Sequence, residues 1–534
     1  MKCVLTFFVS VTVLIAAWSL AVLHRAVLLP PEPAATVQTG SARSRFIPKA
    51  DAKIHQLVLE GTHFERGDMA GQHTSHLLLL QEQSLNGKLN EIIPNAFLRR
   101  ALQVLAMRWF WGNDRYFESW AKEEMYGVGR WAPPEFDHLA DGYTRQAAYH
   151  GLHEVGQMMV DQGLEDMGCT VIAHPDGEHW VIGRNFDFEG GLVFDTEKIM
   201  KWVFPADGFA YVSVVWAGMV GAVTGVNEHG VYISLNAAGS DDFKRHGTPS
   251  TLVLTKALQS AKTAAEAVEV IEKQPMFITD IFVVADRRGG VLYRVEKSPA
   301  KSHVLQHREP VAIANHLVAP VWSGDSVNQY RISELTTRHR AERGQLLVDK
   351  IKSKGKITSL NAEILAILRD KGDDGAGQTL HLGNRRAIDG LIATHAVIYN
   401  TRENVLFVSE GPALTRELHG FDMAASFKAR EPVRVASLPA DGGVTPERYF
   451  AVKASFIELA RARRLLKKKK CEEASVPVEK AHGLFGESSM YYETLGDLKS
   501  CRGDREGAVE AWRRAVELVP AYARQAKSLE EKLK

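Results

Sequence analysis

The strongest constraint on the fold is a short segment, residues 166–189, in which a single cysteine precedes a pair of apolar stretches. Residues 170–173 and 179–182 are apolar, and the polar sequence HPDGE joins them. Short apolar runs on either side of a Pro/Asp/Gly turn predict a β-hairpin. Cys169 then begins one strand, and the sequence GRNFDF at 183–188 ends its neighbour. The hairpin therefore brings a thiol, an arginine, an asparagine and an aspartate to one end of a sheet.

The hydrophobic period changes on either side of this cysteine. Residues 72–163 carry apolar residues at helical spacing, whereas residues 170–235 consist of short β-branched and aromatic runs bounded by Gly or Asn. Groups of helical and strand-like stretches follow, as far as a last predicted hairpin at 392–411. Strands in runs with helices segregated between them predict an α+β domain.

Composition divides the 534 residues into six regions. They are an apolar N-terminus at 1–25, a Pro/Ala/Ser/Thr-rich tether at 26–53, a mostly helical segment at 54–168, a central domain at 169–422, a linker with turn signals at 423–449, and a helical tail at 450–534.

The tail has the spacing of a helical repeat. Seven positions match a tetratricopeptide repeat: Tyr492, Leu495, Gly496, Ala508, Trp512, Ala515 and Pro520. A weaker copy lies upstream: Ala462, Leu465, Ala474, Val478 and Ala481. Because two repeats are too few for a free-standing array, we expect this tail to pack on the central domain or on a protein partner. Cys471 and Cys501 lie near facing ends of adjacent predicted helices, where they can form a disulfide in an oxidising compartment.

The N-terminus carries a membrane-targeting signal. Residues 3–23 have no charge and are long enough to span a bilayer. We expect an uncleaved signal anchor, with the main domain outside the cytoplasm, in the periplasm or extracellular space. The alternatives are a protein secreted after cleavage near Ala34-Ala35 and an anchor that leaves the domain in the cytosol.

Charge and motifs exclude several partners. A formal net charge of +1 gives no support for nucleic acid as the main partner. The basic run at 461–470 could contact nucleic acid or anionic headgroups, but we favour a solvated helix face. Neither HExxH nor any other metal-ligand spacing occurs, and a Walker loop is absent, so we predict no metal and no cofactor. Four cysteines are present, and Cys169 is the only one between Cys3 and Cys471, which leaves it without a nearby disulfide partner.

The ordered motifs resemble those of one enzyme family. They are GxxFExGxxxG at 61–71, Gly168-Cys169-Thr170, GRNFDF at 183–188, GVNEHGV at 225–231 leading to Leu235-Asn236, and Ala314-Asn315-His316. Together they are similar to the penicillin acyltransferase-like peptidases of family C45. These are N-terminal-nucleophile hydrolases, beside the bile salt hydrolases and acid-ceramidase-like amidases. The resemblance covers residues 57–412 and implies a four-layer αββα core.

The resemblance also implies a cleaved chain. Cys169 would attack the carbonyl of Gly168, and hydrolysis of the resulting thioester would free Cys169 with a new α-amine. Such an amine has a pKa of about 7.7–8.0 and suits a general base for the thiol. Asp187 would orient the amine, and Arg184 would favour the thiolate. The bile salt hydrolases carry Arg at this point, and the penicillin acyltransferases carry Gln.

The same resemblance gives Asn236 and Asn315 the role of oxyanion donors, each worth roughly 3–4 kcal/mol. Structural interpretations remain open, since Asn often closes turns after strands and Asp187 with Arg184 could form an ion pair. One departure concerns the substrate. The penicillin acyltransferases carry a further Arg where this chain has Leu391, so that role is not transferred.

The sequence therefore predicts a cysteine amidohydrolase or acyltransferase that cleaves a linear non-peptide amide through a thioester on Cys169. Its small-molecule partner would be an amide or acyl substrate. The alternative is a catalytically inactive hydrolase scaffold, tethered to a membrane, that binds proteins through its helical tail. The helical segment at 54–168 would be a propeptide or a second subunit of the enzyme.

Overall fold

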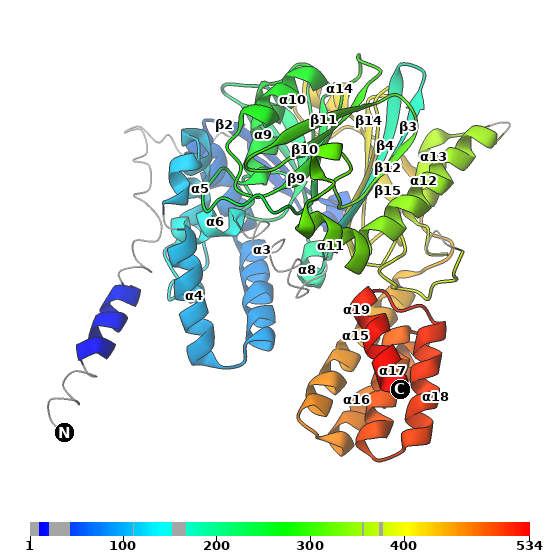
Figure 1. Ribbon diagram of the computed structural model, residues 1–534. Coiled ribbons are helices and arrows are strands. Elements are labelled where there is room, and N and C mark those ends of the chain that lie inside the picture. Colours follow the sequence, from blue (N-terminus) through cyan, green and yellow to red (C-terminus); the bar gives the residue numbers. More distant parts are fainter. Residues whose placement is uncertain (1–9, 21–42, 111, 152–166, 355–356, 373–376) are drawn as a thin grey trace.

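The computed structural model describes residues 10–20, 43–110, 112–151, 167–354, 357–372 and 377–534. Two β-sheets pack face to face, helices lie on their outer sides, and the C-terminal helices form a separate group beneath them (Figure 1). This arrangement confirms the prediction of a mixed α+β fold.

The first sheet has nine strands in the order β1-β2-β5-β6-β7-β8-β9-β10-β11. Only β2 and β5 are parallel neighbours; the other pairs are antiparallel. The strands are β1 (Arg45–Ile47), β2 (His55–Gly61), β5 (Ile199–Pro205), β6 (Tyr211–Val215), β7 (Thr224–Asn227), β8 (Tyr232–Ala237), β9 (Asp280–Ala285), β10 (Leu292–Lys297) and β11 (Ser302–His307).

The second sheet has seven strands in the order β12-β3-β4-β13-β14-β15-β16. They are β12 (Val311–Ile313), β3 (Met167–Asp176), β4 (His179–Phe188), β13 (Ala393–Asn400), β14 (Val405–Ser409), β15 (Leu418–Asp422) and β16 (Arg434–Leu438). Strands β3 and β4 form the hairpin that the sequence predicts, and Cys169 lies opposite Phe186 in its register. The hairpin lies near the middle of the sheet, so its side chains are covered on both faces.

Alternation along β3 assigns its side chains to two different cores. Val171 and Ala173 join the core between the sheets, together with Trp202 from the first sheet. Ile172 faces the opposite way and packs under the outer helices. Successive strand residues point to opposite faces, so Cys169 lies on the inter-sheet side and Gly168 on the outer side.

Helices cover both outer faces. On the nine-stranded sheet they are α3 (His63–Ile92), α5 (Ser119–Gly129), α6 (Gly142–His150), α9 (Ser250–Ser260) and α10 (Ala264–Lys273). On the seven-stranded sheet they are α12 (Thr337–Ser353) and α13 (Leu360–Leu368), preceded by α11 (Ser326–Glu334). Outside the tail, the other described α-helices are α2 (Lys49–Ala52), α4 (Ala96–Phe110), α8 (Leu192–Thr196) and α14 (Met423–Ala429).

The GxxFExGxxxG motif builds the start of α3. The Thr62 hydroxyl oxygen accepts from the Glu65 amide, and the Glu65 carboxylate accepts from the Thr62 amide, so the two form a capping box. Gly67 then lets α3 cross α5 closely, since an added Cβ would lie 2.0 Å from the carbonyl oxygen of Glu124. The motif therefore has a structural role in fixing α3 against α5.

Five helices form the tail: α15 (Pro446–Lys467), α16 (Cys471–Phe485), α17 (Ser489–Cys501), α18 (Arg505–Glu517) and α19 (Ala523–Leu533). Consecutive helices α15 with α16 and α17 with α18 pack closely. At Gly496 an added Cβ would lie 2.4 Å from the indole of Trp512, which explains the small residue there. A Cys471–Cys501 disulfide, with a Cα–Cα distance of 5.8 Å, joins α16 to α17.

The segment between the central domain and the tail differs from the prediction made from the sequence. Residues 423–449, interpreted as a linker, contain α14 and β16, and β16 pairs with β15 at the sheet edge. This strand was missed because its residues are largely exposed and lack an apolar alternation.

Within the described ranges, no helix combines the length and hydrophobicity needed to cross a membrane. Part of the predicted apolar segment, residues 3–9 and 21–23, lies outside those ranges.

Candidate active site

Cys169 is buried near the start of β3, with its Sγ among groups from both sheets. The side chain is 3% exposed. Arg184 Nη2 lies 3.5 Å from Sγ, and the Leu235 carbonyl oxygen lies 3.9 Å from it. Burial raises the pKa of the thiol, while the charge of Arg184 opposes that rise. Cys169 is therefore protonated at neutral pH and needs a base to become a nucleophile.

Arg184 is held by acceptors that carry no charge. Its guanidinium donates to the Val223 carbonyl at 3.1 Å, to the Leu235 carbonyl and to the Thr224 hydroxyl, and its Nε lies 3.4 Å from Asn236 Oδ1. No carboxylate among the described residues forms an ion pair with it. Because nothing neutralises this charge locally, Arg184 is oriented to favour a thiolate on Cys169.

His395 of β13 supports this arginine. Its Nε2 lies 3.1 Å from Thr224 Oγ1, and its ring stacks on Phe186 at a centroid distance of 5.1 Å. Burial and, next, the charge of Arg184 hold its pKa well below the usual 6.5. The imidazole is therefore neutral and can accept from the Thr224 hydroxyl, which fixes that hydroxyl as an acceptor for Arg184. Sequence reasoning did not single out His395, because its role depends on contacts between distant strands.

Asp187 faces away from Arg184, on the outer side of the hairpin. It lies opposite Gly168 in the register of β3 and β4. An added Cβ at Gly168 would lie 3.3 Å from Asp187 Oδ2 and 3.1 Å from Arg340 Nη2. Burial raises the pKa of Asp187 to about 7, against the opposing charge of Arg340. The ion pair between Asp187 and Arg184 that was considered above is not formed.

Arg340 on α12 is a site residue that the sequence analysis missed. Its Nη1 donates to the Cys169 carbonyl at 2.6 Å and to Thr170 Oγ1 at 2.8 Å. Its Nη2 donates to Asn315 Oδ1 at 2.8 Å. The side chain is buried and carries a charge beside the start of β3. Nothing in the helical pattern around it distinguishes this arginine from its neighbours, so the sequence held no signal for it.

Asn315 follows β12 and orients the backbone of Cys169. Its Oδ1 accepts from the Cys169 amide at 2.8 Å, and its Nδ2 donates to the Ala237 carbonyl at 2.8 Å. Asn236 lies nearby, and its Nδ2 donates to the carbonyls of Ile313 and Ala314 at 3.4 and 3.2 Å. The structure thus bonds Asn315 to Cys169 and places Asn236 beside Arg184, but the amide NH2 groups of both asparagines bond protein carbonyls. The oxyanion role stays a prediction.

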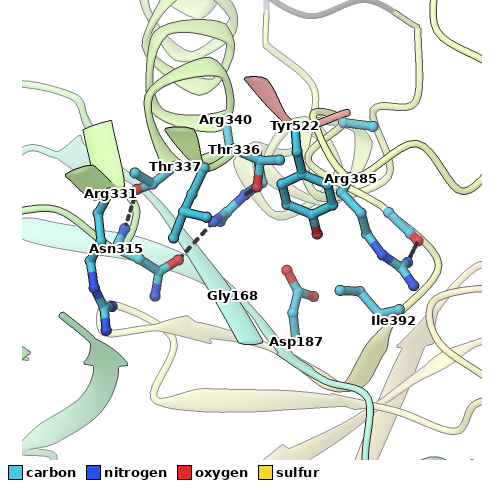
Figure 2. A pocket seen from close by; sticks show the side chains of 13 residues that line it. Gly168, Asp187, Asn315, Arg331, Thr336, Thr337, Arg340, Arg385, Ile392 and Tyr522 are labelled. Atoms are coloured by element: carbon cyan, nitrogen blue, oxygen red, sulfur yellow. Dashed lines mark hydrogen bonds between the residues drawn. The ribbon is translucent and has the colours of Figure 1, made fainter. Parts of the chain in front are cut away.

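A small polar cavity of about 40 Å³ lies on the outer side of the hairpin (Figure 2). Gly168, Asp187, Asn315 and Arg340 line one side of it. The lining also includes Arg385 and, from the tail, Tyr522. The cavity therefore adjoins the Gly168–Cys169 bond without including the sulfur, which lies on the other side of the strand.

A second, apolar cavity of about 140 Å³ lies toward the helices of the first sheet. The wall nearest the residues that hold Arg184 is formed by Phe186, Trp216 and Val223. Another wall is formed by Leu78 and Leu85 of α3. Glu82 is at its polar end, where burial raises the pKa of the carboxyl to about 7. The two cavities thus lie on opposite sides of the β3–β4 hairpin, one polar and one apolar.

The part of the chain that holds most of these site residues matches a known protein family. Residues 173–394 match the family model described as acyl-coenzyme A:6-aminopenicillanic acid acyl-transferase. The match covers less than half of the chain and begins just after Cys169. At the level of class, this match supports an enzyme of the acyltransferase type. Among curated protein sequences, none is a significant match.

Several solved structures are also similar to this chain. A Caenorhabditis elegans ortholog of N-acylethanolamine-hydrolyzing acid amidase has 14% identity and a TM-score of 0.32, over 44% of this chain and 93% of that one. Two variants of conjugated bile acid hydrolase from Clostridium perfringens each have 13% identity. The first has a TM-score of 0.32 over 50% of this chain and 96% of that chain. The second has a TM-score of 0.34 over 52% of this chain and all 100% of that chain.

Proposed function

We propose that this protein is a self-processing cysteine amidohydrolase or acyltransferase that cleaves a linear, non-peptide C–N amide through a thioester on Cys169. The observation that carries the proposal is the pairing of one buried thiol with an arginine 3.5 Å away that no carboxylate in the described ranges neutralises. The acyltransferase family match over residues 173–394 supports the same class of reaction.

Processing would begin at the Gly168–Cys169 bond. The sulfur attacks the Gly168 carbonyl carbon, the C–N bond breaks, and the nitrogen of Cys169 takes up a proton as it leaves. Water then hydrolyses the thioester, which leaves a carboxylate on Gly168 and a free thiol and α-amine on Cys169. Gly168 suits this step, because a side chain there would contact Arg340 and Asp187.

The new α-amine would be the general base. The Cys169 nitrogen already lies 2.8 Å from Asn315 Oδ1, which would hold the amine in place. The carboxyl of Asp187 lies on the same side of β3 and would balance the charge of the amine when it is protonated. An amine attached to the same residue as the thiol needs no further positioning to take the proton.

Oxyanion stabilisation would come from amide donors at the end of β3. Asn236 and Asn315 are candidates, since both lie beside Cys169 on segments that follow or end strands. In the uncut chain their amide groups bond the carbonyls of Ala237, Ile313 and Ala314. We propose that cleavage before Cys169 lets at least one of them turn toward the bound acyl group.

The apolar cavity would hold the acyl group of the substrate. Its wall at Phe186 and Val223 borders the residues that hold Arg184, and it lies on the same side of the hairpin as the sulfur. A dry cavity of about 150 Å³ lined by apolar side chains accepts a molecule of benzene's size. The 140 Å³ cavity therefore suits an apolar acyl group about the size of a phenyl ring or a short aliphatic chain.

Three finer assignments accompany this proposal. The three packed cores support a four-layer αββα N-terminal-nucleophile hydrolase domain. The paired helices of the tail, with Gly496 against Trp512, support tetratricopeptide-like repeats. The Cys471–Cys501 disulfide supports an oxidising compartment, and so the placement of the catalytic domain outside the cytoplasm.

Trapping the acyl-enzyme tests the proposed reaction. Purified protein is mixed with hexanoyl p-nitroanilide, quenched in acid within the first turnover and mapped by mass spectrometry. The proposal predicts release of p-nitroaniline and a hexanoyl group on Cys169 alone. A Cys169→Ala protein that releases p-nitroaniline at the wild-type rate would show that the mechanism is wrong. An unbroken chain that is inert to both the amide and a thiol reagent would favour the inactive scaffold.

A further inference from the structure

The C-terminal tail is joined to the catalytic domain beside the polar cavity. Asn384 Nδ2 donates to the Val519 carbonyl at 2.8 Å, and Arg386 Nε donates to the Ala521 carbonyl at 3.1 Å. Val519 also packs with buried Leu380 and Ala387 of the central domain. These bonds fix the backbone just before α19, so the position of that segment is set by the catalytic domain.

A second connection runs from α15 to an arginine that lines the cavity. Lys453 Nζ lies 2.7 Å from Glu189 Oε1, and the other oxygen of Glu189 pairs with Arg385. Arg385 also donates to the Gly390 carbonyl at 2.6 Å. Tyr449 is buried against the domain, and its hydroxyl donates to Asp195 at 3.0 Å. These contacts hold the start of α15 in place. The tail therefore helps to position a side chain of the site.

Tyr522 brings the tail into the cavity itself. It precedes α19, and its side chain lines the cavity together with Gly168 and Asp187. In Figure 2 the ring lies between Arg340 and Arg385, with its hydroxyl on the side of Asp187. The tail thus contributes Tyr522 to the wall of a cavity that adjoins the Gly168–Cys169 bond. The other lining residues belong to the catalytic domain.

The polar cavity lies on one side of the hairpin, and this position determines which part of a substrate would bind in it. The sulfur lies on the inter-sheet side, whereas the Cys169 nitrogen bonds Asn315, which lines the polar cavity. If the freed α-amine is the base, it must lie within hydrogen-bond reach of the nitrogen that leaves. That geometry directs the amine part of the substrate toward the polar cavity and the acyl part away from it.

We propose that the tail supplies a wall of the amine subsite and that Tyr522 is a specificity-determining residue for the amine part of the substrate. This inference rests on the proposed function. The aromatic ring limits the size of the amine that fits beside Asp187 and Arg385. The tail is then a component of the catalytic unit, and its removal would open the subsite.

Two amides of the same acid test the proposal: hexanoyl methylamide, with a small amine, and hexanoyl p-nitroanilide, with a bulky one. The measured quantity is the ratio of kcat/KM for the bulky amide to kcat/KM for the small amide. Tyr522→Ala is expected to raise this ratio about tenfold, the lower end of what a change in pocket size gives. Tyr522→Phe keeps the ring and is expected to keep the ratio, and Tyr522→Trp is expected to lower it.

Tyr492→Ala is the matched control, since Tyr492 is a tail tyrosine that packs on Tyr491 and Arg514 and does not line the cavity. It is expected to leave the ratio unchanged. Thermal unfolding of each variant separates an opened subsite from a misfolded tail. An unchanged ratio in both folded Tyr522→Ala and folded Tyr522→Trp would overturn the inference. Failure of the proposed function looks different, since the wild-type protein would then hydrolyse neither amide.

Discussion

Arg184 Nη2 lies 3.5 Å from the Sγ of Cys169, and every acceptor that holds this guanidinium is a neutral oxygen or a neutral imidazole. The arginine therefore keeps its full charge beside a buried thiol. Its neighbours on β7, β8 and β13 fix its direction.

Replacing Arg184 with Gln should raise the pKa of the Cys169 thiol. A cation this close favours the thiolate, so its loss moves the onset of thiolate formation to higher pH. The measurement is the rate of alkylation by iodoacetamide from pH 6 to 10. Arg402→Gln, which removes an arginine paired with Asp176 on the surface, serves as the control. Superimposable profiles for the wild type and Arg184→Gln would contradict the assignment.

Asp187 should make the uncut chain less stable as the pH rises. Its pKa is raised from the usual 3.8 to about 7 by burial, so the folded protein holds this proton more tightly than the unfolded chain. The resulting stability is present below pH 4 and is lost as the pH rises through 7. In a Cys169→Ala background, Asp187→Asn should therefore raise Tm at pH 8 and change it little at pH 4. Equal effects at both pH values would argue against a buried, titrating carboxyl.

Arg340 should be needed for the processing step. It bonds the Cys169 carbonyl and Asn315, so Arg340→Met leaves buried acceptors without donors, each costing about 1–3 kcal/mol. We expect a lower Tm and at least a tenfold slower cleavage before Cys169, followed by gel electrophoresis over time. Arg338→Met on the same helix is the matched control, because Arg338 is exposed and pairs with Glu342 on the surface. Cleavage at the wild-type rate in Arg340→Met would remove this residue from the site.

The tail should depend on its disulfide for stability. Cys471 and Cys501 are separated by 30 residues, and closing a loop of that length stabilises a fold by about 3–4 kcal/mol in the chain-entropy account. Thermal unfolding with and without a phosphine reductant should show a lower Tm for the tail after reduction. Cys501→Ser should unfold at the temperature of the reduced wild type in either buffer. A Tm that is insensitive to the reductant in the wild type would contradict a structural role.

The local parts of this site could be predicted from the sequence, and the long-range parts could not. The hairpin that holds Cys169, Arg184 and Asp187 depends on residues within about twenty positions, so its turn and its apolar runs were visible. Arg340 reaches Cys169 across 171 positions through helix packing, and no local pattern marks it. The same holds for Tyr522, whose place in the cavity follows from how the tail docks.

The fold, too, could be predicted only where burial leaves a local pattern in the sequence. The α+β class followed from the change of hydrophobic period, because burial of alternating faces imposes that period on the sequence. The edge strand β16 escaped notice because an exposed edge imposes no such pattern. The roles of Asn236 and Asn315 came from the ordered motifs alone, and the structure adds that Asn315 accepts from the Cys169 amide.

The most direct test of the account is the intact mass of the purified protein. Wild-type protein should give two fragments, one ending at Gly168 and one beginning with Cys169, and Cys169→Ala should give a single unbroken chain. A wild-type protein that stays in one piece while it still turns over an amide through Cys169 would contradict the central claim, because the α-amine base would not exist.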